Sequence, residues 1–173
     1  NISMVFQDVY LFEDTIENNI KFGTQNATKE DVIEAAKKAQ CHDFIVSLPQ
    51  GYDTFIGEGG ASLSGGEKQR ISIARAMLKD APIIIFDEAT ANIDPENEDK
   101  LKLAIESLTN NKTVIMIAHR LPSIRNVDEI LVMEDGKIIE RGTDSQLMSV
   151  DSKYRKFQNL YSVANEWRVN YEK

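Results

Sequence analysis

The chain has 173 residues, of which 42% are hydrophobic and 28% charged, and its net charge is −8 at pH 7. These proportions are typical of a globular protein, and the length suits one domain or a core with a subdomain. The acidic balance disfavours nucleic acid as a partner, because nucleic-acid-binding scaffolds usually present a basic face. The only cysteine, Cys41, cannot form an internal disulfide, which indicates a reducing compartment. No apolar run reaches the roughly 18 residues of a membrane-spanning helix, so we expect no direct insertion into a bilayer.

Residues 1–79 are expected to form one strand followed by helices. Alternating hydrophobic residues over 2–6 predict a strand that ends at Gln7. Helices are predicted at 14–22, 29–39, 42–48 and 65–78. Thr28 is placed to cap the second helix, because acidic residues follow in its first turn. The glycine-rich stretch 51–60 is predicted to be a loop.

From residue 80 onward the pattern changes to alternating strands and helices. Strands are predicted at 83–86, 113–118, 129–133 and 137–140, and helices after Asp94-Pro95, near 122, at 144–149 and at 152–167. The Asp135-Gly136 turn joins the last two strands into a hairpin. We therefore expect a core strand over 1–7, a helical subdomain over 8–79, and the remainder of an α/β core over 80–173.

Two interpretations fit the start of the helix at 65–78. Ser64 as N-cap with Glu67 three residues later forms a capping box, which needs no ligand. Gly65 and Gly66, however, lie inside the first turn, where each glycine costs on the order of 1 kcal/mol relative to alanine. That cost makes sense if another molecule approaches the bare backbone closely. The free N–H groups and positive dipole end of a helix suit a phosphate, and both interpretations stay open at this point.

The strand at 83–86 runs into two adjacent carboxylates, Asp87 and Glu88. Any hydrophobic strand can end in two acids, yet α/β sheets bind ligands at the carboxyl ends of their strands. Neighbouring strand residues point in opposite directions, so the two acids are expected to have different roles. Asp87 is placed to hold a magnesium ion, which prefers oxygen ligands. Glu88 is placed to polarise a water molecule that attacks a terminal phosphate.

His119 follows the strand predicted at 113–118. A lone histidine at a strand end is more often structural than catalytic, so its role depends on its neighbours. Beside Glu88 it could contact the γ-phosphate and orient the attacking water. Gln7 also ends a strand, and by itself that position indicates no function.

Five segments, in this order, resemble motifs of the nucleotide-binding domain of ABC transporters. They are Gln7 (Q-loop), 63–70 (signature motif), 83–90 (Walker B strand with its catalytic glutamate), 91–94 (D-loop) and His119 (H-loop). The Gly-Glu-Gly-Gly segment at 57–60 is similar to the exporter branch of the family, and the resemblance covers essentially the whole chain. It implies an α/β fold with a P-loop NTPase (RecA-like) core, truncated at its N-terminal side, and an inserted α-helical subdomain.

The resemblance implies that ATP and Mg²⁺ bind between two nucleotide-binding domains, which form a homodimer or a heterodimer. Ser64, Gly65, Gly66 and Glu67 would contact the γ-phosphate of an ATP molecule held by the second domain. The usual residue at the position of Glu67 is glutamine, and an acid so close to a triphosphate could weaken that contact.

Other roles are implied within the same domain. Asp87 and Gln7 would serve the magnesium ion, and Glu88 would act as the catalytic base. His119 would read the γ-phosphate, and Asp94 would connect the two sites of the dimer.

Tyr10 and Glu58 would pass closure of the dimer to the transmembrane domain of the transporter. The resemblance therefore places the full-length protein at the cytoplasmic face of a membrane, hydrolysing ATP to power export.

One motif of the family is missing, because no Gly-x-x-x-x-Gly-Lys-Ser/Thr loop occurs in the sequence. That loop cradles the phosphates. We interpret the chain as the C-terminal part of a nucleotide-binding domain, cut from a longer polypeptide. Alone, it is expected to be soluble, to self-associate, to bind ATP weakly and to show no measurable ATPase activity.

Two alternatives remain. The chain could be a regulatory module that supplies its signature motif to a complete partner without hydrolysing ATP. A chromosome-maintenance or DNA-repair ATPase shares the signature and Walker B motifs. However, such proteins insert long coiled coils, and no sustained heptad pattern is present here.

Overall fold

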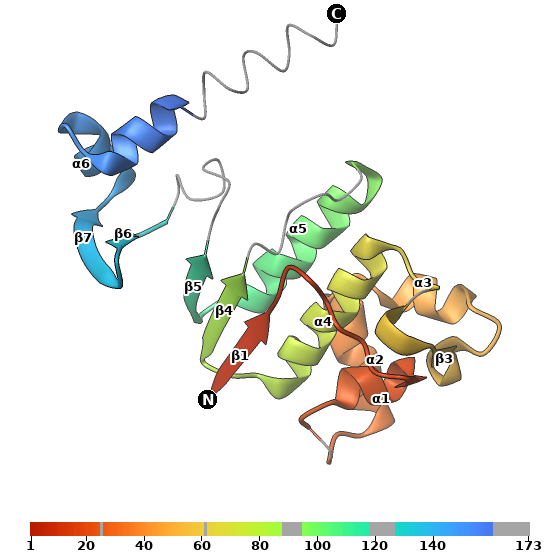
Figure 1. Ribbon diagram of the computed structural model, residues 1–173. Helices are drawn as coiled ribbons and strands as arrows, with labels where there is room; N and C mark the ends of the chain where they lie inside the picture. The colour runs from red at the N-terminus through yellow and green to blue at the C-terminus, as the bar shows by residue number, and fades with distance from the viewer. Residues whose placement is uncertain (25, 61, 88–94, 118–126, 161–173) are drawn as a thin grey trace, which may run out of the picture. The chain divides into compact units, whose positions relative to one another are not determined.

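The computed structural model describes residues 1–24, 26–60, 62–87, 95–117 and 127–160. The chain divides into two compact units, Asn1–Ile117 and Ala118–Lys173. The first holds a small parallel sheet with helices beside it, and the second holds a hairpin with short helices (Figure 1). None of the described helices is both long and apolar enough to cross a bilayer.

The first unit is built on a three-stranded parallel sheet in the order β1-β4-β5. Its strands are β1 (Ile2–Val5), β4 (Ile83–Asp87) and β5 (Thr113–Ile117). Ile2 pairs with Ile83, and Ile83 pairs with Thr113, so the carboxyl ends of all three strands lie at one edge. Between β4 and β5 the chain forms α5 (Pro95–Thr109), since parallel neighbours need a long crossover.

The connection from β1 to β4 contains most of the helices of this unit. They are α1 (Ile16–Lys21), α2 (Lys29–Lys38), α3 (His42–Ser47) and α4 (Gly65–Lys79), with the 3-10 turns η1 (Gly51–Asp53) and η2 (Glu58–Gly60). A ribbon of β2 (Asp14–Thr15) and β3 (Phe55–Ile56) accompanies them. The helix α4 is central, because it packs against α1, α2, α5 and β1 (Figure 1).

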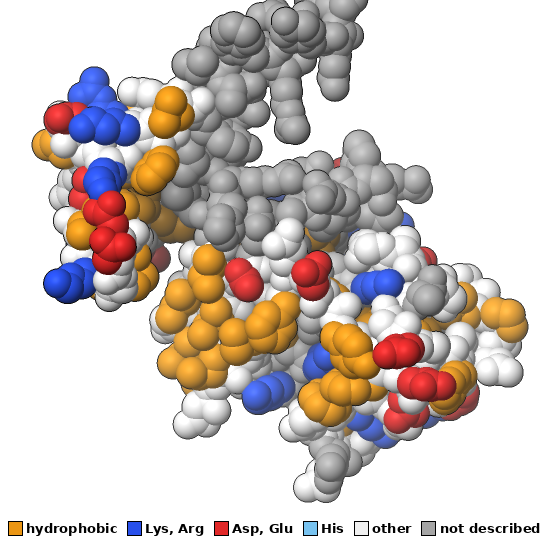
Figure 2. Space-filling model, in the orientation of Figure 1, with side chains coloured by type: hydrophobic (Ala, Val, Ile, Leu, Met, Phe, Trp, Pro, Cys, Tyr) orange, Lys and Arg blue, Asp and Glu red, His pale blue; other side chains and the backbone are white. Residues whose placement is uncertain are grey.

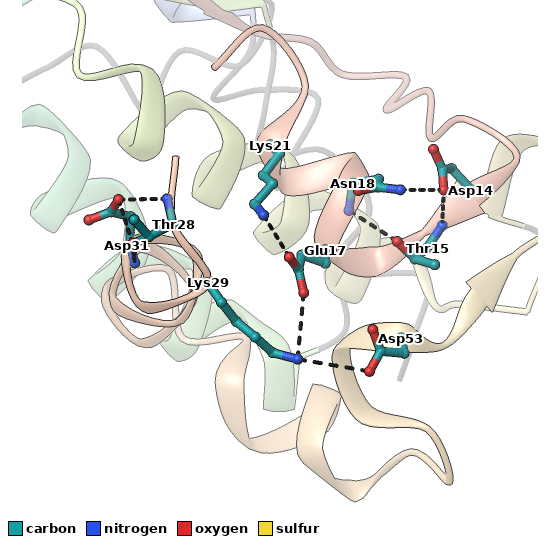
Figure 3. A network of polar contacts seen from close by, with 9 residues as sticks. All are labelled: Asp14, Thr15, Glu17, Asn18, Lys21, Thr28, Lys29, Asp31 and Asp53. Carbon is teal, nitrogen blue, oxygen red and sulfur yellow. Dashed lines mark hydrogen bonds and ion pairs between the residues drawn. The ribbon is translucent and has the colours of Figure 1, made fainter. Parts of the chain in front are cut away.

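The start of α2 is fixed by side chains, as Figure 3 shows. Thr28 accepts a hydrogen bond from the N–H of Asp31, whose carboxylate accepts one from the N–H of Thr28 at 2.8 Å. The cap predicted at Thr28 is therefore confirmed. Lys29 Nζ lies 3.7 Å from Glu17 Oε2 and 3.9 Å from Asp53 Oδ2, which links α2 to α1 and η1. Such partly exposed pairs contribute at most about 1 kcal/mol each.

One hydrophobic cluster fills the space between the sheet and its helices. The sheet contributes Val5, Ile84 and Phe86, each no more than 1% exposed. Residues of α4 and α5, among them Ile71 and Ala104, belong to the same cluster. Because side chains of a strand alternate between faces, this packing covers one face of the sheet.

The opposite face of the sheet carries exposed hydrophobic side chains. Ile2 and Met4 of β1 and Ile115 and Ile117 of β5 are between 45% and 50% exposed. Figure 2 shows hydrophobic side chains gathered over these strands. A contiguous apolar patch of this kind is typical of a contact surface.

The second unit contains the antiparallel hairpin of β6 (Ile130–Glu134) and β7 (Lys137–Gly142). Asp135 and Gly136 form its turn with φ of 48° and 75°, the left-handed backbone of a two-residue hairpin turn. The predicted hairpin is thus confirmed.

Two helical segments follow this hairpin, α6 (Asp144–Ser149) and residues 153–160. The Glu140 carboxylate accepts hydrogen bonds from the N–H groups of Lys153 and Tyr154 at 2.6 and 3.1 Å, which caps the second segment. Tyr154, only 2% exposed, shares a small core with the hairpin and α6.

The elements predicted from the sequence are largely confirmed, with two differences. The helix predicted at 14–22 begins at Ile16, because Asp14–Thr15 pairs with Phe55–Ile56 as a short ribbon. That partner strand lies inside the stretch 51–60, where only a loop was predicted. The helix predicted near 122 and the end of the helix at 152–167 lie outside the described residues. The boundaries at 7/8 and 79/80 remain a prediction.

Candidate functional site

The helix α4 begins at the segment that the sequence singles out. Ser64 Oγ accepts a hydrogen bond from the N–H of Glu67 at 3.3 Å. The Glu67 carboxylate accepts from the N–H and the hydroxyl of Ser64 at 2.8 and 2.9 Å, so the predicted capping box is present. The first N–H groups of a helix have no intrahelical partner, and here they belong to Gly65 and Gly66.

Gly65 has no reason within the described structure to be glycine. It is not among the residues with positive φ, and a Cβ atom added to it would meet no described atom within 4 Å. Gly65 is also exposed. Since glycine near the start of a helix costs stability relative to alanine, close approach of a molecule from outside explains it better than local geometry does.

Gln7 and Asp87 follow neighbouring strands at the same edge of the sheet. Val5 pairs with Phe86, so Asp87 is the next residue beyond this pair on β4 and Gln7 comes two residues after Val5. Asp87 is half-buried and Gln7 is exposed. This edge is where parallel sheets bind ligands, and carboxylate and amide oxygens suit Mg²⁺.

Three predicted site residues, Glu88, Asp94 and His119, lie outside the described residues. Among the residues that are described, no group of three or more His, Cys, Asp or Glu side chains could hold a metal ion. The described part of the candidate magnesium site therefore consists of Asp87 and Gln7.

A groove lies between β1 with the segment after it, the residues that follow α1, and the helix α4. Its volume is about 330 Å³, and it is lined mainly by hydrophobic and aromatic side chains, including Tyr10, Phe12 and Phe22. The rings of Phe12 and Phe22 are stacked with centroids 4.3 Å apart, and the rings of Tyr10 and Phe12 are nearly perpendicular with centroids 5.4 Å apart. Tyr10 thus lies in the groove, whereas Glu58 is exposed on η2 and is not among the lining residues.

Arg75 of α4 lies beneath this aromatic wall. Its guanidinium is 5.6 Å from the centroid of Phe12 and 5.3 Å from that of Phe22. Arg75 Nε donates to the carbonyl of Asn19 at 2.8 Å and an Nη donates to Asn19 Oδ1 at 3.2 Å. Burial lowers the pKa of Arg75 from its usual value, but the group stays protonated at physiological pH.

Apart from Tyr10, which the resemblance implied, these groove residues belong to no motif that the sequence reveals, so they were not predicted. One signal was present in α1, where Ile16, Asn19 and Ile20 are spaced to share a helix face. An asparagine between two buried isoleucines indicates a polar group that must find partners inside the protein.

The chain is similar to known proteins of one family. The family model described as ABC transporter matches residues 1–91. The chain belongs to the ABC transporter family. It is also 51% identical over 159 residues to an ATP-dependent lipid A-core flippase of Syntrophus aciditrophicus (strain SB), which covers 92% of this chain and 26% of that protein. A putative multidrug export ATP-binding/permease protein, YgaD of Bacillus subtilis (strain 168), is 48% identical over 164 residues, 95% of this chain and 28% of that protein.

Among solved structures, a bacterial Atm1-family ABC exporter with ATP bound matches with a TM-score of 0.82 and 44% identity. The match covers 91% of this chain and 28% of that one. It confirms the fold class, a P-loop NTPase core with an inserted helical subdomain, and makes this an ABC transporter ATP-binding domain with exporter-type relatives. The chain spans about a quarter of the length of the ABC transporter proteins that it matches.

Proposed function

We propose that this chain belongs to a protein that hydrolyses ATP to power export across a membrane. The single observation that carries the proposal is the start of α4, where a capped helix presents Gly65 to the exterior with open space in place of a side chain. Exposed N–H groups at such a helix start bind phosphate oxygens well. The exporter-type relatives support the same function.

In this proposal the γ-phosphate of ATP is held by a second nucleotide-binding domain, and α4 contacts it from the opposite side. The N–H groups of Gly65 and Gly66 supply hydrogen bonds to it, and the Ser64 hydroxyl donates to it after releasing its hydrogen bond to the Glu67 carboxylate. Glu67 contributes by accepting a hydrogen bond from the N–H of Ser64, which keeps the start of the helix in place. The partner is a second copy of this domain or a related one.

The edge of the sheet supplies the groups for hydrolysis. Asp87 and Gln7 hold Mg²⁺, which neutralises charge on the phosphates when it is bound. Glu88 accepts the proton of the attacking water, and His119 orients that water against the γ-phosphate. Asp94 links this site to the second one.

The groove is the surface through which closure of the two domains acts on the membrane part of the transporter. Tyr10 with its aromatic neighbours offers an apolar surface, and Glu58 lies on η2 in the segment before α4. We propose that the transmembrane part of the transporter binds there and follows closure of the two domains. The protein then acts at the cytoplasmic face of a membrane.

Phosphate release by the complete polypeptide that contains this chain tests the proposal. Glu88→Gln should lower turnover of MgATP by about 10²-fold or more, the usual contribution of a general base. Glu30→Gln is the matched control, because Glu30 is an exposed carboxylate in the first turn of α2. Normal turnover by the Glu88→Gln variant would contradict the proposal.

A further inference from the structure

The helix α4 holds the main chain after β1 at two points. Gln69 Nε2 donates to the carbonyl of Phe6 at 3.3 Å, and an Nη of Arg75 donates to the carbonyl of Tyr10 at 3.4 Å. Gln69 is only 4% exposed, and its bond to Phe6 is partly buried. The segment 7–9, which begins with Gln7, is therefore spanned by two anchors on a single helix.

The second anchor is reinforced by Asn19, which is 1% exposed. Asn19 Oδ1 accepts from the N–H of Phe12 at 2.8 Å, and its Nδ2 donates to the carbonyls of Phe12 and Thr15, both at 3.0 Å. Two donors of Arg75 bind the same asparagine. A buried amide satisfied on every side holds its partners in one geometry.

The same guanidinium packs near the two stacked rings of the groove. Phe22 is 54% exposed and Tyr10 is 55% exposed, so a ligand in the groove meets these rings first. Because Arg75 packs near the Phe22 ring and donates to the Tyr10 carbonyl, a shift of either residue acts on Arg75. Ser64 begins the helix that carries Arg75, about 16 Å away along its axis at 1.5 Å per residue.

We propose that Arg75 is a positioning residue, and that Gln69 is a second anchor. Through them, the segment of Gln7 and the start of α4 move together when the occupant of the groove moves. The inference rests on the proposed function, because it assigns a mechanical role to the groove and to Ser64. Loss of the anchor should free residues 7–12 without altering the phosphate contacts at 64–66.

Hydrogen exchange of the complete transporter tests this, measured without nucleotide and after trapping with MgATP and vanadate. In the wild type, nucleotide should protect both 7–12 and 62–67. In Arg75→Ala the segment 62–67 should stay protected, while exchange over 7–12 should rise about tenfold or more and lose its response to nucleotide.

Arg75→Lys is a second, milder variant for the case that Arg75→Ala does not fold. Lysine keeps the charge and the aliphatic stem but lacks the planar set of hydrogen-bond donors of arginine. This variant should show the same decoupling to a smaller extent. Lys37→Ala is the matched control, since Lys37 is an exposed cation of α2 outside the groove, and its side chain forms no hydrogen bond or ion pair with the described residues.

The outcomes separate the two claims. A wild type whose segment 62–67 does not respond to nucleotide would contradict the proposed function. A wild type that responds, with both Arg75 variants keeping the response over 7–12, would overturn the coupling role of Arg75 and leave the proposed function standing.

Discussion

At the scale of residues, the acid in the signature segment has a structural task. Glu67 accepts two hydrogen bonds from Ser64, so its carboxylate completes the cap of α4. The same group brings a negative charge to the helix start that is proposed to meet the γ-phosphate. Stability and nucleotide affinity therefore place opposite demands on this side chain.

Replacing Glu67 by glutamine should separate these demands. The amide oxygen can still accept from the N–H of Ser64, so Glu67→Gln should change the free energy of unfolding by less than about 0.5 kcal/mol. Glu67→Ala should lower the free energy of unfolding by about 1 kcal/mol, because only the hydrogen bond from the N–H of residue 67 to Ser64 remains in the cap. Removal of the charge should also lower the KM for MgATP of the complete protein several-fold. Urea unfolding and ATPase kinetics measure the two effects, and equal destabilisation by both substitutions would argue against this role of the cap.

Cys41 is a second residue whose chemistry follows from burial, which raises its pKa to about 12. The unfolded thiol ionises near pH 8.5. Because the folded pKa is the higher one, stability is lost as pH rises above the unfolded value, by about 2 kcal/mol between pH 8 and pH 10. This loss should be absent in Cys41→Ala, and the folded thiol should resist alkylation at pH 8. Rapid alkylation without unfolding would show that the thiol is accessible.

At the scale of elements, α5 packs against α4 and contributes one of its faces to the hydrophobic core. Leu101 is 2% exposed and Leu103 is 53% exposed on the same helix. Leu101→Ala should cost about 2–5 kcal/mol of unfolding free energy, the usual cost of a cavity in a core. Leu103→Ala should cost less than about 1 kcal/mol. The two variants share residue type and helix, so similar losses in urea unfolding would mean that α5 is packed on both faces.

The elements also show how far the sequence predicts the structure. Strong signals, such as the Ser64 cap and the apolar run of β4, predicted α4 and β4 to within one residue at each end. The ribbon of β2 and β3 could not be predicted, because two residues per strand give no periodicity and their pairing depends on tertiary contacts. The Asn19–Arg75 contact joins residues 56 positions apart, and no local pattern reveals such a pair.

At the scale of the whole molecule, the chain spans about a quarter of the length of its exporter-type relatives. Among the described strands, β1 and β5 lie at the edges of the sheet, and one face of this sheet is apolar with Ile115 exposed. Open strand edges and apolar faces favour association with further chains.

We therefore expect the 173-residue chain alone to self-associate. Without a phosphate loop in its sequence, it should also bind ATP weakly and release no phosphate. Light scattering, calorimetry and a phosphate assay measure these properties. Ile115→Lys should reduce the association, because it places a charge on the apolar face. A monomer that turns over ATP would contradict the expectation on both counts.

The central claim is that the start of α4 in one copy of the domain binds the γ-phosphate of an ATP molecule held by the second copy. Light scattering of the complete ATP-binding domain tests it most directly, in a Glu88→Gln background that keeps ATP intact. With MgATP this variant should dimerise, and adding Gly65→Asp should leave it monomeric, because a carboxylate then occupies the place of the phosphate. Equal dimerisation of both proteins in MgATP would contradict the claim.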